Sequence, residues 1–134
     1  MKTSLGIWAF GAMATRFNPG GYKPELAGAA TAAKVRTAVE GLGDLMDDYE
    51  FHYPQELSRE NLEAVVQALD GHGIYCVCSG LHLDPQFAKG GFSSPDDATR
   101  AAALQLTKEG IDLAGEQKPP FANCASRWRP LQTQ

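Results

Sequence analysis

IYCVCSGLH, residues 74–82, is a short apolar run that ends in a glycine, a leucine and a histidine. Two earlier stretches have a similar form, GIWAF at residues 6–10 and YEFHYP at residues 49–54, and they carry Trp8 and His52 near their ends. Short apolar runs bounded by turn residues are typical of buried strands. We therefore expect three strands, each of which delivers a polar or aromatic side chain beside a turn.

Helical patterns alternate with these runs. The first lies near residues 29–41, the second follows Ser58 as its expected N-cap, and the third follows Ser94 as its expected N-cap and ends near residue 117. The apolar stripe expected on the third helix consists of Ala101, Leu104, Ile111 and Ala114. Alternating strands and helices predict an α/β fold whose parallel strands are joined by crossover helices.

The loops that leave parallel strands at their carboxyl ends share one rim, and this rim holds the active sites of α/β folds. Trp8, His52 and His82 lie at or near the ends of the three apolar runs. We expect these side chains to lie together and to form the candidate site.

Length and charge narrow the possible functions. The chain has 134 residues, whereas a barrel of eight strand and helix units takes about 250. A formal net charge of -4 argues against a nucleic-acid partner, because such proteins neutralise phosphates with basic residues. No apolar stretch is long enough for a membrane span, and we expect a cytoplasmic chain with no membrane partner.

Cys76 and Cys78 fall on the same face of the third expected strand, because side chains alternate along a strand. We interpret them as packing residues in a reducing compartment, with a metal or redox pair as the alternative.

Three segments together resemble the first three units of a xylose isomerase type TIM barrel. They are GIWAFG at residues 6–11, EFHYP at residues 50–54, and above all GLHLDPQFAKGGFSSPDDATRAAALQLTKEGIDLA at residues 80–114. The resemblance covers about residues 5–114. It implies a partial (β/α)8 barrel over residues 1–117, made of about three N-terminal βα units with parallel strands.

The resemblance also implies a function, the metal-dependent interconversion of an aldose and a ketose. The histidine that matches His52 assists opening of the sugar ring and would be the catalytic residue, while the tryptophan that matches Trp8 helps to wall the sugar pocket. We expect His82 to bind substrate as well. Because it stands where the family carries an aromatic residue, we expect the choice of substrate or the role of this residue to differ from that in the xylose-specific members. The full-length family uses divalent cations (Mg, Mn or Co), but no residue of this chain matches its metal ligands. We expect the chain to be inactive alone.

The chain departs from the family pattern after the second strand. Tyr53, Pro54 and Gln55 follow His52 where the family has a run of aspartates, and Glu56 is the nearest carboxylate.

The last segment, KPPFANCASRWRPLQTQ at residues 118–134, has neither a strand nor a helix period. We expect an irregular tail, and interpret it as the end of a truncated or frame-shifted gene product.

Two alternatives stay open. A zinc-dependent apurinic endonuclease, which shares the barrel superfamily, would use His52 and His82 as zinc ligands. A non-catalytic remnant or binding fragment would leave sheet edges open to water and would tend to self-associate.

Overall fold

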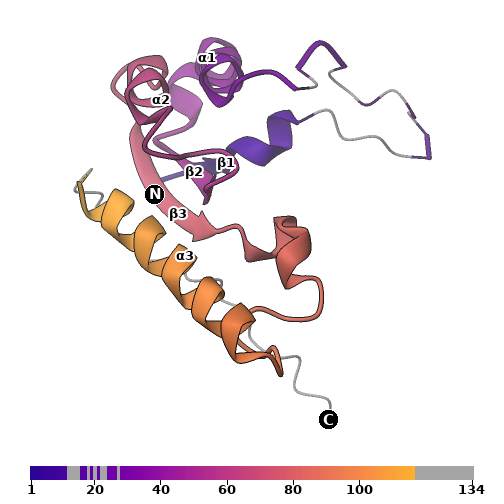
Figure 1. Cartoon of the computed structure of the whole chain (residues 1–134). Coiled ribbons are helices and arrows are strands. Elements are labelled where there is room, and N and C mark those ends of the chain that lie inside the picture. The colour runs from indigo at the N-terminus through magenta and orange to yellow at the C-terminus, as the bar shows by residue number, and fades with distance from the viewer. Residues whose placement is uncertain (12–15, 18, 20, 22–23, 27, 117–134) are drawn as a thin grey trace.

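The fold is a mixed α/β arrangement around a parallel sheet. A computed structural model describes residues 1–11, 16–17, 19, 21, 24–26 and 28–116 (Figure 1). Its strands are β1 (Ser4–Gly6), β2 (Asp48–Tyr53) and β3 (Gly73–Ser79), all parallel and in the order β1-β2-β3. The predicted parallel strands are thus confirmed. The tail, residues 118–134, lies outside the described residues.

Three α-helices alternate with these strands, as the helical patterns predict. They are α1 (Thr31–Leu42), α2 (Leu62–Ala68) and α3 (Asp97–Glu116). Short 3-10 helices occupy the turns and loops: η1 (Ile7–Phe10), η2 (Pro24–Leu26), η3 (Gly43–Leu45), η4 (Leu81–Leu83) and η5 (Pro85–Phe87). The first apolar run is therefore a strand only as far as Gly6, and Trp8 lies on η1.

One core joins the helices to a single face of the sheet. Tyr49 and Phe51 of β2 are fully buried in a cluster that includes Val35 of α1, Val65 of α2 and Leu113 of α3. Because strand side chains alternate, the neighbouring residues of β2 belong to the opposite face of the sheet. The candidate site lies on that opposite face, at the rim formed by the carboxyl ends of the strands.

Two expected helix caps are wrong. The Ser58 amide donates to Asn61 Oδ1 at 2.8 Å, so Ser58 belongs to a turn that precedes α2. At α3, Asp96 Oδ2 accepts the Thr99 amide at 2.7 Å, whereas Ser94 Oγ accepts the Asp96 amide at 3.2 Å. The cap thus lies at Asp96, because its carboxylate reaches the third helical amide.

The expected apolar stripe of α3 is also wrong at most positions. Leu104 and Ile111 are 49% and 44% exposed. The buried positions are Ala103, Thr107, Gly110, Leu113 and Ala114. All of these residues except Leu113 are small, because α3 lies close to the sheet: a Cβ on Gly110 would stand 3.3 Å from the ring of Tyr53.

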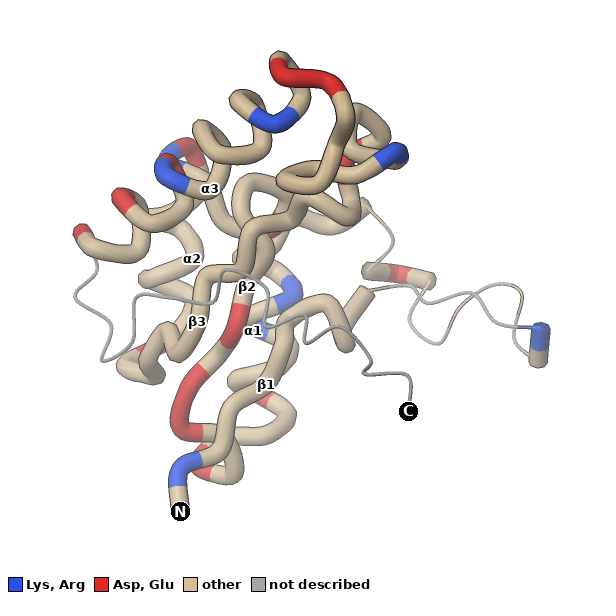
Figure 2. The backbone as a smooth tube through the Cα atoms, turned by 90° about the horizontal axis from the view of Figure 1, so that it is seen from below, with Lys and Arg blue, Asp and Glu red and all other residues tan. Residues whose placement is uncertain are grey.

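Charges are mixed over the described chain. Figure 2 shows an acidic stretch at the start of β2 and both signs of charge along α3. Asp47 is held in this stretch by Thr3, whose amide donates to Asp47 Oδ2 at 2.7 Å and lowers the pKa of that carboxyl.

None of the described helices combines the length and the apolar character that a membrane span requires.

Candidate functional site

Three rings meet at the carboxyl-terminal rim of the sheet. The ring centroids of Trp8 and His52 are 4.4 Å apart with the planes inclined by 47°, and those of His52 and His82 are 5.0 Å apart in an edge-on contact. Trp8 comes from η1 after β1, His52 from the end of β2, and His82 from η4 after β3. The predicted meeting of these side chains is confirmed.

Trp8 is positioned by the glycine at the end of β1. A Cβ built on Gly6 would overlap the indole ring, so the indole lies directly on the backbone of that strand. Trp8 is 39% exposed, which leaves part of its apolar ring open to a ligand. Gly6 is therefore a requirement of the site, and only the packing of the indole reveals it.

His52 is paired with a carboxylate four residues later. Glu56 Oε2 accepts the backbone amide of His52 at 2.8 Å and lies 3.0 Å from Nδ1 of the same residue. The His52 carbonyl oxygen in turn accepts the amides of Glu56 and Leu57 at 2.9 Å and 3.0 Å. A closed turn that includes the cis peptide bond Tyr53–Pro54 thus holds acid and imidazole together.

This pair has an electrostatic consequence. The hydrogen bond that Glu56 accepts from His52 raises the pKa of His52 above its ordinary value. Desolvation opposes this increase, and the charges of Glu56, Cys78 and Glu50 add to it. Only 12% of the His52 side chain and 14% of the Glu56 side chain are exposed, so water screens the interaction weakly. Glu56 therefore supplies a carboxylate that lies directly against the imidazole.

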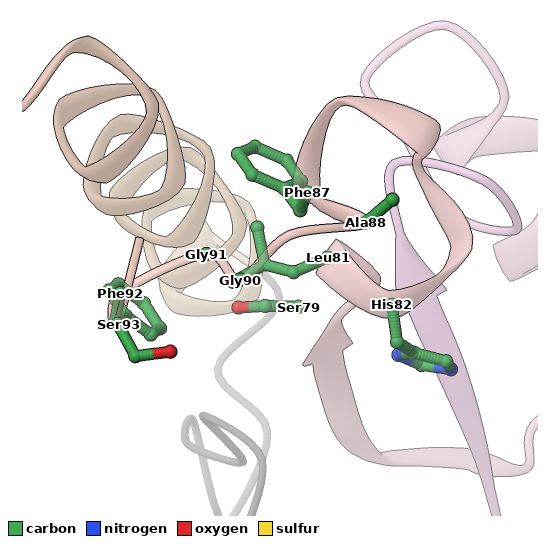
Figure 3. A pocket seen from close by; sticks show the side chains of 9 residues that line it. All are labelled: Ser79, Leu81, His82, Phe87, Ala88, Gly90, Gly91, Phe92 and Ser93. Carbon is green, nitrogen blue, oxygen red and sulfur yellow. The ribbon is translucent and has the colours of Figure 1, made fainter. Parts of the chain in front are cut away.

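A cavity of about 640 Å³ lies beside His82. Figure 3 shows His82 on the strand side of this cavity and Phe92 with Ser93 on the α3 side. Phe87 is buried and Phe92 is 49% exposed. A mostly apolar wall with a few polar groups is typical of small-molecule sites. Sequence reasoning did not assign these phenylalanines to a site, although both lie in the loop that carries the family resemblance.

The described residues do not fit a divalent cation. No three His, Cys, Asp or Glu side chains within this part of the chain are grouped so that they could hold a metal ion. His52 and His82 lie side by side, but a third ligand for zinc is not among the described residues.

The comparison with known proteins does not identify a family for this chain. No model of a protein family matches the chain, and no curated protein matches it at a significant level.

Proposed function

We propose that this chain forms the sugar-facing part of an aldose–ketose isomerase site of the xylose isomerase type. The observation that carries the proposal is the imidazole–carboxylate pair of His52 and Glu56 beside an exposed indole. In this proposal the three βα units are part of a TIM barrel, and the remaining units would complete the rim.

His52 is the acid and base in this proposal. Its Nδ1 is engaged by Glu56, so Nε2 is the ring nitrogen that exchanges a proton with the sugar. Protonation of the ring oxygen, with loss of the anomeric hydroxyl proton, opens a cyclic aldose to its aldehyde. The raised pKa of His52 keeps this proton available near neutral pH.

Trp8 and His82 bind the sugar in this proposal. The exposed part of the indole offers an apolar face to sugar C–H groups, and the imidazole offers a hydrogen bond to a hydroxyl. The neighbouring cavity, about 640 Å³, has the size of ordinary small-molecule sites.

The cation-dependent step lies outside this assignment. Divalent cations would supply the polarisation of sugar oxygens that a hydride shift requires, and the described residues offer no group to hold them. The proposal for this chain is therefore limited to sugar binding and ring opening.

Ring opening can be measured without any metal, because an opened aldose recloses to either anomer. The experiment follows the mutarotation of freshly dissolved D-xylose by polarimetry in the presence of the chain. We expect acceleration that saturates with sugar and that exceeds the effect of free imidazole at the same concentration. His52→Gln should abolish it.

His72→Gln is the matched control, because His72 bonds to the carbonyl oxygens of Leu69 and Gly43 and lies away from the rim. The proposal fails if His52→Gln and His72→Gln have the same effect, or if no aldose is affected. In that event, zinc-dependent cleavage of DNA that contains apurinic sites would favour the endonuclease alternative, with His52 and His82 as ligands.

A further inference from the structure

Two thiols touch on the face of the sheet opposite the core. Cys76 and Cys78 lie two residues apart on β3, and their Sγ atoms are 3.4 Å from each other. Cys76 is 5% exposed, whereas Cys78 is half-buried. The two sulfurs are therefore in direct contact, and Cys78 is the more exposed residue of the pair.

The neighbouring strand places ionisable groups beside this pair. In the register of β2 and β3, Glu50 stands opposite Cys76 and His52 stands opposite Cys78. A protonated imidazole next to a thiol favours the thiolate, which is the reactive form of cysteine. We therefore expect Cys78 to react first, because it is the more exposed of the two and stands opposite His52.

We propose that Cys76 and Cys78 form a dithiol site that takes a low-molecular-weight disulfide, such as oxidised glutathione, and closes reversibly to an intrastrand disulfide. The Cys78 thiolate attacks one sulfur of the reagent and releases one thiol. The Cys76 thiolate then attacks Cys78 Sγ and releases the second. One protein dithiol is oxidised, one external disulfide is reduced to two thiols, and the two thiol protons pass to the released molecules.

The strand permits this bridge but does not favour it. Residues two apart on an extended strand have Cα atoms about 6.6 Å apart, near the upper limit of about 6.8 Å for bridged cysteines. A register shift between Tyr49 and Glu50 makes Tyr75 the extra residue on β3, immediately before Cys76, and such irregularities let a strand bend. We expect a strained bond that forms under oxidising conditions and is readily reduced.

The experiment uses the chain with Cys124→Ser, which leaves the two strand thiols as the only cysteines. The folded protein is equilibrated with mixtures of oxidised and reduced glutathione. The samples are then quenched with acid, alkylated and digested, and the peptide masses are measured by mass spectrometry. We expect the peptide that holds both cysteines to lose two hydrogen atoms as the oxidised fraction rises, and to regain them on reduction. Unmodified thiols at every ratio, or glutathione adducts alone, would overturn the proposal.

Two further measurements keep the result interpretable. Cys76→Ala and Cys78→Ala, each in the same background, should stop at a single glutathione adduct, and the adduct at Cys78 should form at least several times faster. Circular dichroism on the same samples reports the fold. A bridge that forms only after denaturant has unfolded the chain would also overturn the proposal. This inference does not depend on the proposed sugar chemistry, because neither its reaction nor its readout involves a sugar.

Discussion

Replacing Glu56 by glutamine tests how the negative charge of Glu56 affects His52 at the rim. In the unmodified chain, Glu56 Oε2 lies 2.8 Å from the backbone nitrogen of His52 and 3.0 Å from its Nδ1. Glu56→Gln keeps the size of the side chain and an oxygen that can accept from both groups. It removes the negative charge and replaces the other carboxylate oxygen by an amide nitrogen. The substitution therefore isolates the charge-assisted part of the hydrogen bond.

The size of the effect follows from the burial of the pair. Side chains that are 12% and 14% exposed are weakly screened. A hydrogen bond to a charged group contributes about 1.5 to 3 kcal/mol, against about 0.5 to 1.5 kcal/mol for a neutral one. We expect Glu56→Gln to lower the free energy of unfolding by about 1 to 1.5 kcal/mol when His52 is protonated.

The pH dependence has a definite sign. The Glu56 hydrogen bond raises the pKa of His52 above its value of 6.5 in an unfolded chain. A raised native pKa means that the folded state binds the proton more tightly, so this stabilisation is complete below pH 6.5 and disappears as pH rises through the native pKa. The loss in Glu56→Gln should thus be larger near about pH 5.5 than near about pH 8.5.

Urea denaturation at both pH values measures the effect, and imidazole NMR signals give the pKa of His52 directly. Glu63→Gln is the matched control, since Glu63 is exposed in the first turn of α2. A double-mutant cycle with His52→Gln isolates the coupling. Equal losses in Glu56→Gln and Glu63→Gln at both pH values, or an unchanged pKa of His52, would refute the reasoning.

The remaining predictions concern packing. Gly6→Ala should lower stability and displace the indole of Trp8, because the added Cβ would overlap that ring; a shifted indole N–H signal in NMR spectra checks it. Leu113→Ala, at a fully buried position, should cost about 2 to 5 kcal/mol in urea denaturation, whereas Leu104→Ala, 49% exposed, should stay within about 0.5 kcal/mol. Tyr49→Phe should raise stability by about 1 kcal/mol, because the buried Tyr49 hydroxyl has no hydrogen-bond partner among the described residues. Thermal denaturation checks the last prediction, and a clear loss would contradict it.

Much of the fold could be predicted from local patterns. The three apolar runs predict strands because their hydrophobic side chains need a core, and β2 and β3 each begin one residue before the corresponding run. The sequence did not reveal which face of α3 would be buried. Leu104 and Ile111 have the apolar character of a core stripe, but apart from Leu113 the helix buries small residues, because Gly110 meets the ring of Tyr53.

The candidate site, like the fold, could be predicted from the sequence only in part. Trp8, His52 and His82 could be chosen from their places after the expected strands, because parallel strands bring their carboxyl ends to one rim. The role of Glu56 could not be chosen, since a turn decides whether the carboxylate reaches Nδ1. Phe87 and Phe92 needed the loop conformation as well, because they are part of the cavity wall only after η5 and the following turn have formed.

The sequence by itself determined the alternation of strands and helices, the parallel sheet and the residues at its rim, because hydrophobic period and chain order act locally and through simple connection rules. Tertiary structure alone decided how those residues interact. Contacts such as the indole on Gly6, the carboxylate 3.0 Å from Nδ1 of His52 and the two thiols 3.4 Å apart depend on the distances between individual atoms. Such distances are set by packing, to which every neighbouring element contributes.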